Sequence, residues 1–251
     1  MSNPEALRTY NVSSFSELRD LIEEEISDIG DYVFRRQSNA SWELTSTLDR
    51  LIKHARKTGA KHGPVDDFVQ SHLDRFRLEI RGRRGNSPPK LEENELWALG
   101  QHFGLATPLL DWSRSPYISI FFALGSIEDD QNERVLWCLH KERVEKINAG
   151  LSQKERLELI FPDSDDNKRL LGQSGLFSKG PVMRSVDEWV LKKSRDIYDP
   201  VLIKIVFPGD FDFRRSALKK LELMNINYST LFPDLMGASL YCNNVAEDYR
   251  P

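Results

Sequence analysis

Apolar residues recur with a helical period along most of the chain, in stretches separated by turn residues. Ser14 to Glu17 fits a capping box, and Leu18, Leu21 and Ile22 then supply an apolar face, which predicts a helix from about residue 15. The same periodicity predicts further helices over 46–57, 65–80, 92–103, 117–127, 141–148, 153–159, 186–193, 211–223 and the end of 230–242.

Short runs rich in β-branched and aromatic residues indicate only a few strands. The clearest are residues 32–35, 133–140 and 200–207, with a further short strand at 176–177. "LATPLLDWSRSP" (105–116) is interpreted as an ordered connection, and 161–181 as a long loop. The fold class expected is α+β, a small mixed sheet surrounded by helices, in one domain over 1–251 with its core at about 14–242. The absence of a βαβ series with a Gly-rich turn argues against a Rossmann fold or a P-loop.

Composition and charge narrow the class of protein. The 251 residues are 39% hydrophobic with a net charge of −4, which is typical of a globular chain that does not bind polyanions over its whole surface. Arg75 to Arg84 form a basic stretch, either a solvated helix face or an edge that contacts nucleic-acid phosphates. The two cysteines lack metal-ligand spacing, so no metal site is expected. No apolar run reaches membrane-spanning length, so we expect a cytoplasmic protein without a membrane partner.

Polar residues at the ends of apolar segments are the first candidates for chemistry. Gln101 and His102 end a predicted helix, and Asp111 follows a short apolar run. His102 is either an acid or base near neutral pH or a histidine hydrogen-bonded within the core. Asp111 is either a site residue or a carboxylate that caps the helix beginning near Ser115 or holds the preceding turn.

A second candidate segment is "RLLGQSGLFSKGP" (169–181). Arg169 and Gln173 stand beside glycines that allow close approach to a ligand, although an ordinary flexible loop explains the composition equally well. Arg35 ends the predicted strand 32–35. It is expected either to face a pocket or to form a structural ion pair with Asp111, and the two can coexist.

Four stretches together resemble the FRG domain family, named for an aromatic-Arg-Gly motif. They are "VFRRQSNASWELTSTLDR", "LGQHFGLATPLLDWSRSPYISIFFAL", "RLLGQSGLF" and "LKKLELMNINYSTLFPDLMGASLY". The resemblance spans nearly the whole chain and departs from the family pattern at Arg36, where the motif has glycine.

The aromatic-Arg strand is also similar to the first motif of arginine-class ADP-ribosyltransferases, an analogy at the level of the fold. That analogy implies NAD as cofactor, its phosphates held by Arg35, because a planar guanidinium binds phosphate through paired hydrogen bonds. Such enzymes also need a glutamate. Glu43, Glu188 and Glu247 are candidates by position only, and none lies in the expected motif.

These observations lead to one expected site and three hypotheses about function. The expected catalytic residues are His102, Asp111 and Gln173; the expected ligand-binding residues are Phe34, Arg35, Gln37, Gln101, Trp112, Arg169 and Thr230. The first hypothesis is an NAD-consuming toxin or phage-defence effector that modifies a protein or nucleic acid. The second is a non-catalytic module that binds a nucleotide or a protein, and the third an RNA-directed toxin that uses Arg75 to Arg84.

Overall fold

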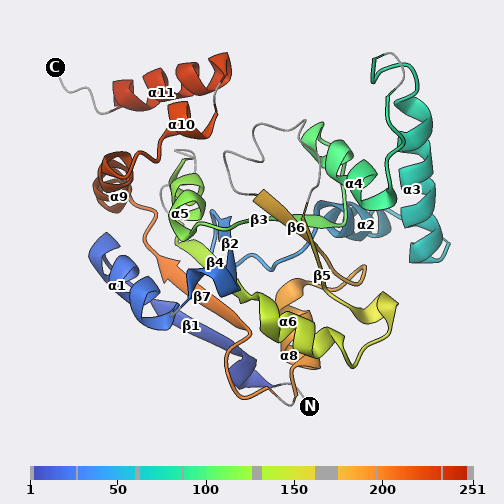
Figure 1. The fold of residues 1–251 in the computed structure, drawn as a ribbon, viewed down its shortest axis with the longest axis horizontal. Coiled ribbons are helices and arrows are strands. Elements are labelled where there is room, and N and C mark those ends of the chain that lie inside the picture. Colours follow the sequence, from blue (N-terminus) through green and yellow to red (C-terminus); the bar gives the residue numbers. More distant parts are fainter. Residues whose placement is uncertain are drawn as a thin grey trace.

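A computed structural model describes residues 3–26, 28–59, 63–85, 88–125, 132–161, 175–195, 197–232 and 234–247. The described residues form one seven-stranded mixed sheet covered by helices, in the order β1-β7-β4-β2-β3-β6-β5. Helices α1 and α9 lie toward one end of the molecule and α2, α3 and α4 toward the other (Figure 1). The α+β class predicted from the sequence is therefore confirmed.

The strands differ in how they pair. They are β1 (Leu7–Asn11), β2 (Tyr32–Gln37), β3 (Leu109–Ser113), β4 (Arg134–His140), β5 (Glu158–Ile160), β6 (Gly175–Lys179) and β7 (Leu202–Phe207). Strand β1 runs parallel to β7, and all other neighbouring pairs are antiparallel. The parallel pair lies at one edge, so the centre of the sheet is antiparallel.

Two of the helices begin with serine side-chain caps that the sequence made recognisable. Ser14 accepts a hydrogen bond from the Glu17 amide, and Ser46 accepts one from the Asp49 amide, so α1 and α2 begin where predicted. The α-helices are α1 (Phe15–Glu25), α2 (Thr47–Lys57), α3 (Val65–Glu79), α4 (Glu93–His102), α5 (Pro116–Leu124), α6 (Lys141–Asn148), α8 (Val186–Lys193), α9 (Phe211–Leu223), α10 (Tyr228–Leu231) and α11 (Leu235–Glu247). Short 3-10 helices are η1 (Pro4–Ala6), η2 (Ile29–Asp31) and η3 (Gln153–Glu155).

Three apolar clusters hold the helices to the sheet. The first joins α1, α5 and α9 to one face of β2, β4 and β7, and includes Phe34. The second joins α6 and α8 to the other face and includes Val33, because neighbouring strand residues point to opposite faces. The third packs α2, α3 and α4 against Leu109 of β3 and Phe177 of β6. The second cluster also contains Trp112 of β3 and Leu176 of β6, so α6 and α8 belong to a cluster that spans both halves of the sheet.

The sheet divides between β2 and β3. Strand β2 pairs with β4 from Tyr32 to Gln37, whereas its register with β3 consists of Phe34 opposite Ser113. Side chains take up backbone carbonyls at this division: Ser119 Oγ donates to the Phe34 oxygen at 3.2 Å, and Arg35 Nη1 donates to the Asp111 oxygen at 2.6 Å. A division of this kind leaves room for a ligand beside backbone that is already hydrogen-bonded.

Two predictions about elements were wrong, and one strand was not predicted at all. "LATPLLDWSRSP" contains β3, which has apolar residues on both faces and so lacks the alternation typical of a half-buried strand. Residues 153–159 form η3 and the start of β5 instead of a helix. Strand β1 was not predicted, because its sequence "LRTYN" is mostly polar. No helix among the described residues combines the length and the apolar character that a membrane span requires.

Candidate functional site

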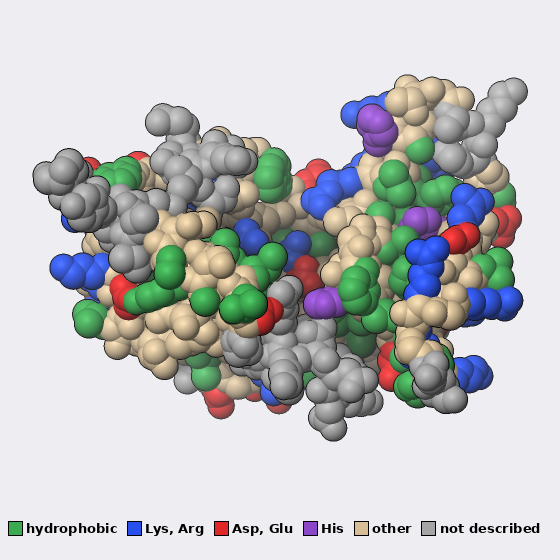
Figure 2. All heavy atoms as spheres, turned by 90° about the horizontal axis from the view of Figure 1, so that it is seen from above, with side chains coloured by type: hydrophobic (Ala, Val, Ile, Leu, Met, Phe, Trp, Pro, Cys, Tyr) green, Lys and Arg blue, Asp and Glu red, His purple; other side chains and the backbone are tan. Residues whose placement is uncertain are grey.

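A pocket of about 520 Å³ opens where β2 and β3 separate. Figure 2 shows this face hollowed at its centre, with basic side chains and an acidic one inside the hollow. The residues that line the pocket are Phe34, Arg35, Arg36, Gln37, Ser38, Trp42, Arg50, Asp111, Trp112, Ser113, Ile118, Ser119, Phe122, Gly175, Leu176 and Phe232. Among these lining residues, three arginines face a single carboxylate.

Arg35 crosses the gap between the two halves of the sheet. Its Nη1 donates to the backbone oxygen of Asp111 at 2.6 Å and lies 3.6 Å from the Asp111 carboxylate. The Arg35 side chain is 18% exposed, and its buried Nε has no hydrogen-bond partner among the described residues. Burial lowers the pKa of Arg35, Asp111 counteracts part of this effect, and the charge of Arg50 adds to it. The guanidinium therefore retains unused capacity for an anion.

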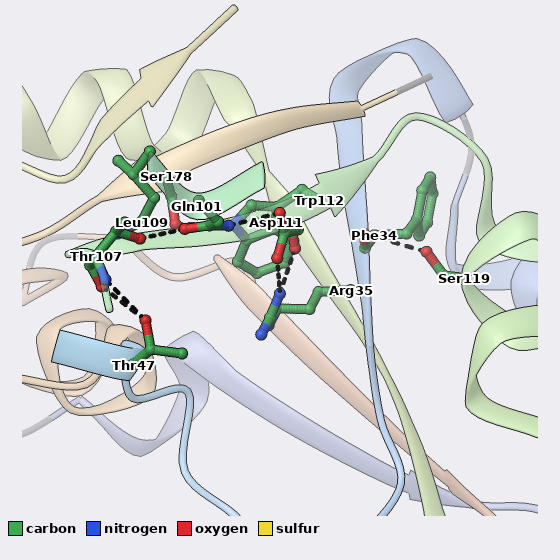
Figure 3. A network of polar contacts seen from close by, with 10 residues as sticks. All are labelled: Phe34, Arg35, Thr47, Gln101, Thr107, Leu109, Asp111, Trp112, Ser119 and Ser178. Atoms are coloured by element: carbon green, nitrogen blue, oxygen red, sulfur yellow. Dashed lines mark hydrogen bonds and ion pairs between the residues drawn. The ribbon is translucent and has the colours of Figure 1, made fainter. Parts of the chain in front are cut away.

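A chain of hydrogen bonds that does not include Arg35 fixes the Asp111 carboxylate (Figure 3). Gln101 Nε2 donates to Asp111 Oδ1 at 2.6 Å, and the Thr107 hydroxyl donates to Gln101 Oε1. Thr107 is fully buried, and Thr47 of α2 both accepts from its amide at 2.9 Å and donates to its carbonyl at 3.1 Å. The orientation of the pocket carboxylate thus depends on α2, on α4 and on the segment before β3.

The other two arginines of the pocket lack an anionic partner. Arg36 and Arg50 are exposed, and neither forms a hydrogen bond or an ion pair with the described residues. The Arg36 guanidinium lies 5.6 Å from the centre of the Phe122 ring. Although Arg36 retains an exposed surface, partial desolvation by the pocket walls, followed by the neighbouring charge of Arg35, lowers the pKa of Arg36. The pocket is therefore electropositive, and Arg36, which replaces the motif glycine, contributes to that charge.

Aromatic rings line the same pocket as the arginines. Phe122 of α5 meets Phe232 edge to face, with ring centres 5.8 Å apart. Trp42, in the connection between β2 and α2, is 48% exposed. Trp42 was not predicted as a site residue, although a tryptophan that closely follows an arginine-rich strand in the sequence is a usable signal. Rings and cations together suit a ligand with both planar and anionic parts.

Three predicted ligand-binding residues line the pocket from within the core. Phe34 is fully buried, and Trp112 is 2% exposed with its indole nitrogen donating to Ser178 Oγ at 2.8 Å. Gln37 is also buried; its amide donates to the Glu43 carbonyl at 2.9 Å and its oxygen accepts from Trp137 at 2.8 Å. Their polar groups are already satisfied within the protein, so these residues shape the wall of the pocket.

The remaining predicted residues lie elsewhere. His102 is exposed at the end of α4, and its ring meets Phe103 edge to face with ring centres 4.9 Å apart. Thr230 belongs to the cap of α10, where its hydroxyl accepts from the Asn227 amide. Neither lines the pocket. Arg169 and Gln173 lie outside the described residues.

Glu43 and Glu188, two of the three glutamates considered as catalytic candidates, do not line the pocket. Glu43 pairs with Lys53 at 3.7 Å, and Glu188 pairs with Lys192 on the same helix. The side chain of Glu247 lies outside the described part of the structure. Within the described ranges, no three His, Cys, Asp or Glu side chains gather in a way that could hold a metal ion. Asp111 is therefore the carboxylate through which the described pocket can act.

Comparison with known families agrees with the motif that begins at β2. A model of the FRG domain matches residues 30–132. Residues 30–132 carry an FRG domain. The matched range includes Arg35 and Asp111, which line the pocket, and Gln101, which does not line it but holds the Asp111 carboxylate. Leu176 and Phe232 of the lining come from outside the matched range. No curated protein and no solved structure matches the chain.

Proposed function

We propose that the pocket binds a phosphate-bearing nucleotide of the NAD type. The observation that carries this proposal is the charge of the lining, three arginines against one aspartate. Buried or crowded cations are costly unless an anion compensates them, and Asp111 compensates at most one of the three. A diphosphate supplies the missing negative charge and several hydrogen-bond acceptors.

We assign parts of the pocket to parts of the proposed ligand. The Asp111 carbonyl holds Nη1 of the Arg35 guanidinium and Nε is buried, so the donors of Nη2 are left for a phosphate oxygen. Arg36 adds a second cation next to Phe122, where a planar base can pack against the aromatic wall. The volume of about 520 Å³ lies in the range of pockets that hold small molecules.

We further propose that the FRG domain transfers ADP-ribose. The bond between nicotinamide nitrogen and ribose C1′ breaks, and nicotinamide leaves with the bonding electron pair. A nucleophile of the target then forms the new bond at C1′ and releases its proton. Asp111 is assigned the stabilisation of the positive charge on the ribose, because its carboxylate is exposed to the pocket and oriented by Gln101. Gln173 enters this scheme as a prediction from the sequence alone, whereas His102 does not line the pocket and is given no role in the scheme.

A non-catalytic nucleotide- or protein-binding module is the alternative. It is favoured by the lining of the pocket, which contains no glutamate among the described residues. An enzyme of the proposed type would act as a toxin or phage-defence effector, because removing NAD or modifying an essential target arrests growth. A module would leave the nucleotide intact.

Incubation with NAD followed by mass spectrometry distinguishes the two functions. The wild type is compared with Arg35→Lys, which keeps the charge and removes the planar guanidinium. Release of nicotinamide by the wild type alone supports the transferase. Thermal stabilisation by NAD without release supports the module. If NAD neither stabilises the protein nor is cleaved to nicotinamide, the proposed function is contradicted.

A further inference from the structure

The exposed face of α2 continues the positive charge of the pocket toward the outside of the molecule. Helix α2 buries Leu48 and Ile52, and Arg50, Lys53 and Lys57 lie on the opposite side, because residues three, four and seven apart share a helix face. We call these three residues the α2 basic strip. Arg50 also lines the pocket, so the strip begins at the pocket mouth.

The charges of the strip are largely uncompensated. Arg50 and Lys57 form no ion pair with the described residues. Lys53 lies 3.7 Å from Glu43, and both side chains are exposed, so water screens this pair. A solvated helix face of an ordinary kind would more often alternate cations with carboxylates.

The charge of the surrounding sequence points in the same direction. Residues 45–90 carry eleven Lys and Arg against five Asp and Glu, in a chain whose net charge is −4. Positive charge is thus concentrated in one part of an acidic protein. Local concentration of this kind attracts a polyanion to one surface without making the whole molecule basic.

An aromatic platform lies at the pocket end of the strip. Trp42 is 48% exposed and lines the same pocket as Arg50. A basic track next to an exposed ring is the combination that binds single-stranded nucleic acid, because phosphates follow the cations and a base stacks on the ring. Paired bases in a duplex cannot offer a free face to Trp42.

We propose that single-stranded nucleic acid binds along the α2 basic strip with a base stacked on Trp42. The strand follows Lys57, Lys53 and Arg50 toward the pocket. Binding of the strand stands on the strip and Trp42, whereas its role as the acceptor of ADP-ribose rests on the proposed function. The strand reaches the pocket at Trp42, and the nucleotide is assigned to Phe122 of the same pocket.

Fluorescence anisotropy with end-labelled 12-nucleotide RNA and DNA of one sequence, single-stranded and duplex, tests this proposal. The variant Lys53→Gln with Lys57→Gln removes two charges from the strip. Its control, Lys146→Gln with Lys219→Gln, removes two exposed lysines on α6 and α9 and changes the net charge equally. Loss of two phosphate contacts predicts about 25-fold weaker binding at 0.1 M salt for the strip variant, and a control within about twofold of the wild type.

Trp42→Ala supplies the second variant. It is expected to weaken single-strand binding at least about fivefold while leaving the residual duplex binding unchanged. Equal losses in the strip variant and its control, or no binding by the wild type, would overturn the proposal. Binding of the strand without nicotinamide release would contradict the transferase activity and support nucleic-acid binding by the strip. Nicotinamide release without strand binding would overturn nucleic-acid binding by the strip and would favour a protein as the target.

Discussion

Arg35 contacts Asp111 twice, and its hydrogen bond is to the backbone. Nη1 donates to the Asp111 carbonyl at 2.6 Å, whereas the carboxylate lies 3.6 Å away and is instead hydrogen-bonded to Gln101. The guanidinium therefore joins the two halves of the sheet without consuming the negative charge of Asp111. Both functional groups remain directed at the pocket, the cation for a phosphate and the carboxylate for a cationic centre.

Asp111→Asn separates binding from turnover. The substitution preserves the backbone carbonyl that holds Arg35 and an oxygen that can accept from Gln101, and it removes the negative charge. Binding of NAD should become up to about fivefold tighter, because an exposed charge at this distance acts through water. Turnover should fall at least tenfold if Asp111 stabilises the ribose cation. Calorimetry and nicotinamide release measure the two effects, and unchanged turnover would remove Asp111 from catalysis.

Thr107 is a positioning residue whose substitution should affect turnover more than binding. Thr107→Val removes the hydroxyl that donates to Gln101 and accepts from the Leu109 amide, at a cost of about 1–2 kcal/mol in unfolding free energy. Gln101 then orients Asp111 poorly, so turnover should fall about tenfold while the Kd for NAD changes less than threefold. Thr107→Ser keeps the hydroxyl and should restore turnover. A parallel loss of binding would indicate general damage to the fold.

Asp49 should make stability depend on pH. It is buried, its carboxylate accepts from the Met183 amide at 2.8 Å, and burial raises its pKa above the ordinary value. A carboxyl whose pKa is raised by folding stabilises fully below the unfolded pKa of about 4 and loses that contribution as pH rises through the folded pKa. Asp49→Asn should therefore raise the Tm at pH 7 and match the wild type near pH 4.

The control for this prediction is Asp49→Ala. It removes the acceptor for the Met183 amide and should lower the Tm at every pH. Met183 has a φ of 65°, and the hydrogen bond from its amide to Asp49 helps to hold this unfavourable backbone conformation. A difference between wild type and Asp49→Asn that does not vary with pH would show that Asp49 is not the titrating group.

Local patterns predicted the helices well and the strands of the divided sheet poorly. The helix from Ser14 and the helix from Ser46 followed from caps and apolar periodicity, which are properties of neighbouring residues. Strand β3 carries Leu109 and Trp112 on opposite, buried faces, so its sequence has no period of two. Strand β1 depends on parallel pairing with β7 almost 200 residues later, which no local pattern can reveal.

The residues of the pocket could also be predicted only in part from the sequence. Arg35 and Asp111 were assigned to one site from motifs, and the structure places them in contact, although the bond through the Asp111 backbone carbonyl could not be foreseen. Arg50 and Trp42 reach the pocket because the connection after β2 and the helix α2 pass beside the division between β2 and β3. Their positions depend on the path of the connection, which side-chain types alone do not fix.

The binding of NAD in the pocket through Arg35 is tested most directly by the fluorescence of Trp42. The other four tryptophans, Trp97, Trp112, Trp137 and Trp189, are at most 2% exposed, so quenching by added NAD reports on the pocket. The wild type should show saturable quenching, and Arg35→Lys should require at least tenfold more NAD, because a lysine cannot donate paired hydrogen bonds to a phosphate. Trp42→Phe should abolish the signal. Equal titrations of wild type and Arg35→Lys, or no quenching at millimolar NAD, would contradict the account.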